Sequence, residues 1–240
     1  MPNAAVGQSG MQALYETMFR NYGILVGQVL VTQPDFANME TKMQLFQTIH
    51  ELLNLNIIPI INTNDAVSPP PQSITDYGGK KRYAFIVSLI FNINYAPGGL
   101  VEYCHENIFI LDNIGIKDND SLAAKVAVEI GAELAILMSD VDGIYNKPPT
   151  QDGARIMHTF VPSDLSTIEF GACSNVGTGG MESKVKSALW ALDRGTSVVI
   201  CNGMEYNTIR KIFAGQRTGS FFTNAEDESI PVEVMAQNGK

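Results

Sequence analysis

Apolar residues along the chain follow two alternating spacings, one typical of amphipathic helices and one typical of buried strands. The helical spacing predicts helices over 10–22, 120–131, 181–194 and 207–214, and another carrying Met39, Met43, Phe46, Ile49 and Leu53. Continuous apolar runs predict strands over 24–32, 57–61, 134–138, 197–201 and 219–223. Strands that are apolar on both faces and alternate with such helices indicate a mostly parallel sheet with helices on both sides. The pattern therefore predicts an α/β fold, a three-layer αβα sandwich.

Local signals predict where two of these helices begin and end. Asp35 precedes the apolar residues Met39 to Leu53 and can cap the helix that carries them. Gly195 follows the predicted helix over 181–194 and is its expected stop signal, since glycine readily takes the left-handed backbone conformation found there.

One stretch, residues 79–111, breaks the alternation of helices and strands. It is rich in Ile, Phe, Tyr and Asn, and residues 97–99 (Pro-Gly-Gly) are compatible with the turn of an inserted β-hairpin. A second interpretation is translated intron, because residues 79–80 (Gly-Lys) can be encoded with a splice donor and 111–112 (Leu-Asp) with a splice acceptor. A genuine loop over a substrate site is the competing interpretation, and it remains open.

The composition is globular and argues against nucleic acid and membranes as partners. The 240 residues, 45% hydrophobic and 17% charged, suit one domain with a substantial core. The net charge is −9, and no basic cluster is larger than residues 80–82 (Lys-Lys-Arg). The longest apolar run, 84–91, is far shorter than the ~20 residues of a membrane-spanning helix. The N-terminus shows no signal peptide, because it lacks a basic segment followed by an apolar one.

Cysteine and histidine positions predict no metal site. The three cysteines, Cys104, Cys173 and Cys201, and the three histidines are scattered without the spacing of metal ligands. We interpret the thiols as buried or incidental in a reducing compartment. Any catalytic chemistry must then come from other residue types.

The first polar cluster, residues 62–66, directly follows a predicted strand. Ligands in parallel sheets bind at the carboxyl ends of strands, so Asn64 and Asp65 are candidates to orient a small zwitterion. Asp65 would take its ammonium group. Asn and Asp are also common turn formers, and a plain turn remains the alternative.

The second polar cluster, residues 117–124, opens a predicted helix with Asp118, Asn119 and Asp120. The N–H groups at a helix N-terminus favour anions, so these side chains can lie beside an anionic ligand. Asp120 as an ordinary N-cap is the alternative interpretation. Two carboxylates flanking an amide exceed what capping requires.

Two further clusters predict a nucleotide site. Ser139 and Asp140 end a strand, and a ribose or base edge can lie against the turn that follows. The segment 176–184 is glycine-rich and opens a helix, so its backbone N–H groups can approach phosphate oxygens. Its order differs from that of a P-loop. The candidate ATP-binding residues of this segment are Thr178, Gly179, Gly180, Met181, Glu182, Ser183 and Lys184.

These clusters together resemble a known family. The segments NTNDAV, KDNDSLAA, LMSDVDGIY and GTGGMESK, spaced as they are, resemble the signature set of the glutamate 5-kinases in the amino-acid-kinase superfamily. KVKSALWAL and VGTGGM are most similar to the kinase half of the animal bifunctional enzymes that make Δ1-pyrroline-5-carboxylate. The resemblance implies one amino-acid-kinase domain over residues 1–224, followed by a tail over 225–240.

The resemblance also implies roles for the candidate residues. Asp65, Asn64 and Asn119 resemble the residues that hold glutamate, and Ser139 and Asp140 resemble the nucleotide-binding pair. The loop ending at Lys184 is similar to the ATP phosphate loop, with that lysine facing the transferred phosphate. Asp118 and Asp120 resemble the carboxylates that orient lysines and Mg²⁺ around the reaction.

The implied activity is the ATP-dependent phosphorylation of the glutamate side-chain carboxylate, a step of proline and ornithine biosynthesis. The cofactors would be ATP and Mg²⁺, and the protein would form a homo-oligomer, with a reductase domain in a full-length bifunctional relative. It would be mitochondrial if of the animal type and cytoplasmic otherwise. Another amino-acid kinase and a non-catalytic nucleotide-binding fragment are the alternatives.

One departure from the family concerns the beginning of the sequence. Family members start with a strand that carries a glycine-rich turn and a lysine, then a Ser-Ser-Gly-Ala-like turn, and neither is recognised here. We therefore expect the polypeptide as printed to be truncated at its N-terminus and inactive or nearly so. A normal turnover number in a coupled ADP assay would refute this expectation.

Overall fold

The computed structural model describes residues 2–67, 88–91, 116, 118–168 and 180–224. These residues fall into two compact units, the first built from 2–67 with 116 and the second from the remainder. The hairpin expected around residues 97–99 and the tail expected over 225–240 lie outside the described residues.

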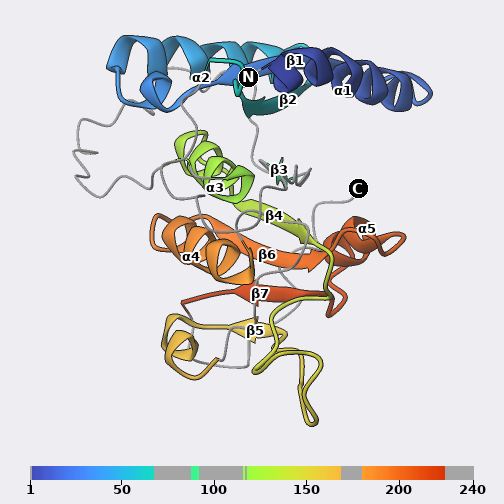
Figure 1. The fold of residues 1–240 in the computed structure, drawn as a ribbon, viewed down its shortest axis with the longest axis vertical. Coiled ribbons are helices and arrows are strands. Elements are labelled where there is room, and N and C mark those ends of the chain that lie inside the picture. The colour runs from blue at the N-terminus through green and yellow to red at the C-terminus, as the bar shows by residue number, and fades with distance from the viewer. Residues whose placement is uncertain (1, 68–87, 92–115, 117, 169–179, 225–240) are drawn as a thin grey trace, which may run out of the picture. The chain divides into compact units, whose positions relative to one another are not determined.

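The first unit contains a two-stranded parallel sheet, coloured blue to teal in Figure 1. In the register of this sheet, Leu25 pairs with Ile57 and Val31 with Thr63. A Cβ atom on Gly27 would lie 3.1 Å from Leu52, so the second helix packs closely on that face of the sheet. The elements of the first unit are α1 Pro2–Arg20, β1 Leu25–Val31, the 3-10 helix η1 Gln33–Phe36, α2 Met39–Asn54 and β2 Ile57–Thr63.

Two expectations for this unit were wrong. Helix α1 begins at Pro2, eight residues before the expected start at Gly10, and it includes Gly7. Glycine costs about 1 kcal/mol in a helix relative to alanine, which hides this part of the helix from a sequence pattern. Helix α1 contacts strand β1, and this packing supports the longer helix despite its glycines.

Asp35 does not cap α2. It lies in η1, where its carboxylate accepts hydrogen bonds from the Thr32 N–H at 2.6 Å and the Thr32 hydroxyl at 2.8 Å. The cap of α2 is Asn38, whose side chain accepts from the Thr41 N–H at 3.0 Å. Asp35 therefore stabilises η1, in which it lies, and Asn38 caps the longer helix α2.

The second unit contains a five-stranded mixed sheet in the order β3–β4–β6–β7–β5 (Figure 1). The β4–β6 and β5–β7 pairs are parallel, whereas β3–β4 and β6–β7 are antiparallel. Its strands are β3 Ser88–Phe91, β4 Leu134–Ser139, β5 Thr159–Phe160, β6 Ser197–Asn202 and β7 Ser220–Phe222. Its helices are α3 Asn119–Glu129, η2 Pro162–Ser166, α4 Gly180–Leu192 and α5 Thr208–Phe213.

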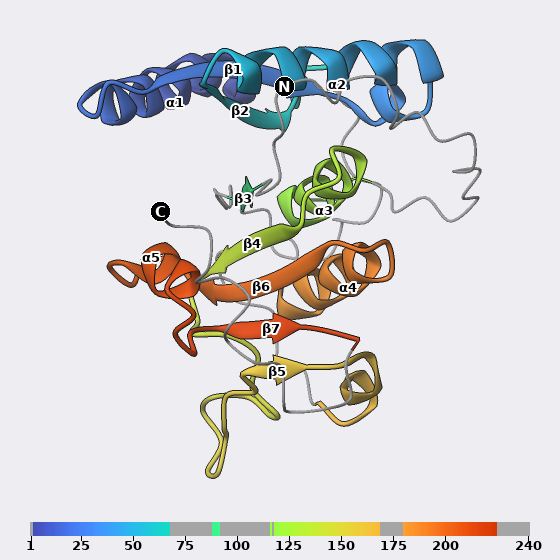
Figure 2. The same ribbon diagram turned by 180° about the vertical axis from the view of Figure 1, so that it is seen from behind.

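Both faces of this sheet bury apolar side chains, as expected for an α/β fold. Alternate strand residues such as Leu137 and Ile200 face a core shared with α3 and α4, which lie side by side in Figures 1 and 2. The intervening residues, such as Ile136 and Val199, pack with Ile212 of α5. Small residues let the two neighbouring helices approach closely, and these are Ala123, Ala124, Ala127, Ala188 and Ala191.

The expected elements of the second unit are found within two residues of their predicted bounds. Gly195 follows α4 with φ +89°, and its N–H bonds the Leu192 carbonyl, which confirms it as the stop signal. The sequence did not reveal β5 or the antiparallel direction of β7, because a two-residue strand has no periodicity and apolar runs do not encode direction.

Gly219 allows the chain to turn into β7. Its φ is +76°, and a Cβ atom there would lie 2.5 Å from the carbonyl oxygen of Ile200. We predict that Gly219→Ala lowers the free energy of unfolding by about 2–5 kcal/mol through left-handed strain and overpacking. Gly195→Ala is the matched control, because its φ is +89° but a Cβ would meet nothing within 4 Å. Equal losses for the two variants in urea unfolding would contradict this account.

Candidate functional site

Asp118 caps α3 and fixes where the helix begins. Its backbone is extended, and one carboxylate oxygen accepts from the Ser121 N–H at 2.9 Å. The Ser121 hydroxyl in turn bonds the Asp118 carbonyl at 2.8 Å, and the Asp118 N–H donates to that hydroxyl at 3.1 Å. The interpretation of Asp120 as the N-cap is therefore wrong, and its carboxylate serves another contact.

Asp120 forms a buried ion pair with Lys184 of α4. The lysine Nζ lies 2.9 Å and 3.0 Å from the two carboxylate oxygens, and the side chains are 1% and 6% exposed. Burial raises the pKa of Asp120 above its ordinary value, and the Asp118 carboxylate adds to this rise, while Lys184 acts in the opposite direction. Each charge is thus stable in the interior only because the other is present.

A second contact ties the same two helices together. The Ser183 hydroxyl donates a hydrogen bond to the carboxylate oxygen of Asp118 that does not cap α3. The starts of α3 and α4 are therefore adjacent, and Asn119 lies in the first turn of α3 between the two bonded carboxylates. Two helix N-termini and the Lys184 ammonium group therefore lie beside the carboxylates of Asp118 and Asp120, and the N–H groups and the ammonium group are the donors that an anion could use here.

The rest of the glycine-rich segment is only partly described. Gly180 begins α4, whereas Thr178 and Gly179 lie outside the described residues. Met181 packs against the core, and Glu182 pairs with Lys186 at 2.6 Å on the exposed side of the helix. Their side chains are thus engaged elsewhere, so a contact with phosphate would come from the first N–H groups of α4, which have no intrahelical partner.

Ser139 is the last residue of β4 and Asp140 follows it, so both lie at the end of the strand as predicted, and the Ser139 hydroxyl donates to the Asp140 carboxylate at 3.2 Å. Ser139 pairs in the sheet with Asn202, whose side-chain amide donates to Asp142 at 2.8 Å. Beyond the ends of these strands lies a cavity of about 150 Å³. It is lined by Met138, Gly203, Glu205, Asn207, Thr208 and Ile209. Sequence reasoning missed this cavity, although Asn202 and Gly203 end an apolar strand as the other clusters do.

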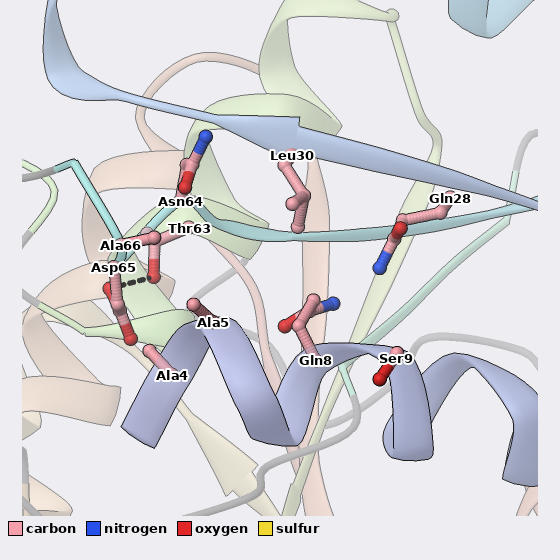
Figure 3. A pocket seen from close by; sticks show the side chains of 10 residues that line it. All are labelled: Ala4, Ala5, Gln8, Ser9, Gln28, Leu30, Thr63, Asn64, Asp65 and Ala66. Carbon is pink, nitrogen blue, oxygen red and sulfur yellow. Dashed lines mark hydrogen bonds between the residues drawn. The ribbon is translucent and has the colours of Figure 1, made fainter. Parts of the chain in front are cut away.

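Asn64 and Asp65 line a cavity of about 280 Å³ in the first unit (Figure 3). The Asn64 N–H donates to the Val31 carbonyl at 2.7 Å, which fixes the chain after β2, and the Thr63 hydroxyl donates to Asp65 at 2.7 Å. The other lining residues come from α1, from β1 and from the turn after β2: Ala4, Ala5, Gln8, Ser9, Gln28, Leu30 and Ala66. Of these, Gln8 and Ser9 were missed because the sequence pattern placed the start of α1 after Ser9, and Gln28 was missed because it lies within an otherwise apolar strand.

The remaining titratable side chains give structural contacts. Burial raises the pKa of Cys201 to about 11, and the nearby Glu205 adds to the rise, so its thiol stays protonated near neutral pH. His158 bonds the Gly219 carbonyl through Nδ1 at 3.0 Å. In the described ranges no group of three or more His, Cys, Asp or Glu side chains could hold a metal ion. None of the helices described is long and apolar enough to cross a membrane.

In sequence, the chain is similar to amino acid kinases and to proteins that contain such a domain. The model of the family described as "Amino acid kinase family" matches residues 3–87 and 96–202. Delta-1-pyrroline-5-carboxylate synthase 1 of Oryza sativa is 39% identical over 220 residues, covering 91% of this chain and 26% of the synthase. The chain thus spans about a quarter of the length of that relative. Glutamate 5-kinase of Clostridium acetobutylicum is 32% identical, covering 91% of this chain and 67% of that enzyme.

A comparison of structures gives a weaker likeness. The T. acidophilum isopentenyl phosphate kinase product complex aligns with 92% of this chain and 73% of its own, at 14% identity and a TM-score of 0.49.

The Asp120–Lys184 pair should show strong coupling in stability. We predict that Lys184→Met costs about 3–5 kcal/mol of unfolding free energy, because it leaves a buried carboxylate without its partner. The double variant Asp120→Leu with Lys184→Met removes both charges and should cost less than Lys184→Met alone. Urea unfolding of the wild type, both single variants and the double variant checks this. Additive losses would contradict the pairing.

The same pair predicts a pH dependence. Folded Asp120 holds its proton more tightly than unfolded Asp120, because its pKa is raised. This carboxyl therefore contributes stability that is lost as pH rises from about 3.8 through the raised value. In Lys184→Met the opposing ammonium group is absent, so we expect that loss to extend to higher pH than in the wild type. Unfolding free energies measured from pH 4 to 8 that change in parallel for both proteins would rule this out.

Proposed function

Because the chain belongs to the amino acid kinase family, we propose that it transfers the γ-phosphate of ATP to the side-chain carboxylate of glutamate. The observation that carries the proposal is the buried Asp120–Lys184 pair where α3 and α4 begin together. Relatives named as glutamate 5-kinases and Δ1-pyrroline-5-carboxylate synthases support the choice of glutamate. We also infer the three-layer αβα architecture for the domain, supported by apolar cores on both faces of the second unit's sheet.

The reaction joins two anions, and the site must reduce their repulsion. Two unit charges 4 Å apart repel by about 4 kcal/mol at an effective dielectric constant of 20. A side-chain carboxylate is already ionised at neutral pH, so its oxygen can attack the γ-phosphorus without a general base. The bond from that phosphorus to the β,γ-bridging oxygen breaks, and ADP and an acyl phosphate result. Catalysis thus consists mainly of charge neutralisation and alignment.

Each residue at the start of α3 and α4 has a place in this proposal. Lys184 neutralises charge on the transferred phosphate, and Asp120 positions its ammonium group. Asp118 holds the two helix starts together through Ser121 and Ser183. The first N–H groups of α4 add donors for the phosphate oxygens.

The substrates would be held by the remaining candidates. We assign the amino-acid end of glutamate to Asn64 and Asp65, which line the cavity of the first unit. Asn119 is proposed to contact glutamate from the first turn of α3. Ser139 and Asp140 are proposed to contact the nucleotide.

ATP would enter as its Mg²⁺ complex. Asp118 and Asp120 are the carboxylates at the start of α3, and each already accepts from α4. Mg²⁺ usually keeps several waters and binds substrate phosphates, so these two carboxylates suit its water shell better than direct ligation. The ion would supply neutralising charge beside Lys184.

The activity is tested by glutamate-dependent ADP release and by trapping the acyl phosphate with hydroxylamine. Calorimetric binding of ATP and of glutamate to the 240-residue chain is the second readout, because it does not depend on turnover. Turnover with glutamate, but not with aspartate or UMP, supports the proposal. Binding of ATP without any binding of glutamate would favour a nucleotide-binding fragment instead.

Lys184 should contribute to ATP affinity. We predict that Lys184→Met raises the Kd of ATP about ten- to a hundredfold, because a charge-assisted hydrogen bond to phosphate is lost. Lys184→Arg keeps the charge and should restore most of the affinity. The matched control is Lys186→Met, two residues along α4, where the lysine is exposed and pairs with Glu182. If the two methionine variants bind ATP alike, Lys184 is not a phosphate ligand.

A further inference from the structure

An amide group in the cavity of the first unit has an unsatisfied donor. Gln8 lies on α1 and lines the cavity with Asp65. Its Nε2 atom is buried and has no hydrogen-bond partner among the residues that the structure describes. We infer that Gln8 binds the α-carboxylate of the amino-acid substrate and determines which acids the site accepts. This inference rests on the proposed function.

The orientation of the Gln8 amide is set by a strand. Its oxygen accepts from the side-chain amide of Asn62 at 3.5 Å, and the Asn62 oxygen accepts from the Thr63 N–H at 2.9 Å. With the oxygen of Gln8 directed to Asn62, its NH₂ group is left for another partner. Figure 3 shows Gln8 extending from α1 toward the strands, opposite Gln28 and Leu30.

The chemistry of the cavity indicates what that partner is. An amide NH₂ group only donates, so its partner must be an acceptor, whereas the carboxylate of Asp65 attracts a donor or a cation. Both residues line the cavity, and a ligand that offers an acceptor and a cation together is the head group of an α-amino acid, with its carboxylate for Gln8 and its ammonium for Asp65. The side-chain carboxylate then points away from this cavity and remains available for phosphorylation.

The charge of the cavity excludes the other substrate. Among the described residues that line it, Asp65 alone is charged, and none is a lysine or an arginine. A nucleoside triphosphate would bring several negative charges beside this carboxylate without a compensating cation. A zwitterion brings no net charge in its head group, and a neutral amide donor suffices for its carboxylate. The cavity therefore suits the amino acid and not ATP.

The test compares glutamate with its α-carboxamide, isoglutamine, which keeps the side-chain carboxylate. Binding is measured by calorimetry with the 240-residue chain and a non-hydrolysable ATP analogue, so that turnover is not needed. We expect Gln8→Leu to weaken glutamate about ten- to a hundredfold and isoglutamine by less than about tenfold, because a carboxamide oxygen is a weaker acceptor than a carboxylate. Gln8→Glu places a carboxylate against the ligand's carboxylate and should reverse the preference toward isoglutamine. Gln12→Leu is the control one turn along α1, outside the cavity lining, and should behave like the wild type.

The outcomes separate this inference from the proposed function. If Gln8→Leu weakens both ligands equally, or neither, the assignment of Gln8 is overturned while the kinase proposal stands. A wild type that binds glutamate but not the ATP analogue contradicts the proposed function, and the ratio of the two affinities still decides the role of Gln8. If the wild type binds neither amino acid, both are overturned. Should Gln8→Leu not fold, the reversed preference of Gln8→Glu decides.

Discussion

A buried carboxylate and a buried ammonium group contact each other where α3 and α4 begin, and the geometry of the candidate site depends on this contact. Neither charge is stable in the interior without the other, so the pair fixes the relative position of the two helix starts. The bond from Ser183 to Asp118 reinforces the same junction. Small alanine side chains between the helices allow the close approach that both contacts require.

Under the proposed function, this junction is where an acidic protein would bind the phosphates of an anionic substrate. The net charge of −9 opposes ATP and glutamate at long range. At short range the donors are Lys184 and the N–H groups at the two helix starts, beside the carboxylates of Asp118 and Asp120, and burial strengthens these interactions because water screens them less. The cavity lined by Gln8 and Asp65 has a different character, since it presents amide groups and one carboxylate to its ligand. The proposed separation of the phosphate site from the amino-acid site therefore rests on these local residues.

Much of the fold could be predicted from the sequence because it rests on local signals. Unbroken apolar runs gave the strands, and Gly195 gave the end of α4. The cap of α3 could not be predicted, because Asp118 and Asp120 both suit a helix start. The choice is settled by Lys184, sixty-four residues beyond Asp120, and local patterns do not report such distant pairing. Gln8 was missed for a related reason: glycines weaken the helical signal around it, and packing on β1 accompanies the helix there.

The claim that one junction gathers the phosphates is tested most directly by a crystal structure of the chain with ADP, Mg²⁺ and glutamate. The account predicts that Nζ of Lys184 lies within about 3.2 Å of a phosphate oxygen or of an ordered water in the transferred group's position. It also predicts that the Asp120 contact remains intact in the complex. A nucleotide whose phosphates bind away from the starts of α3 and α4 would contradict it.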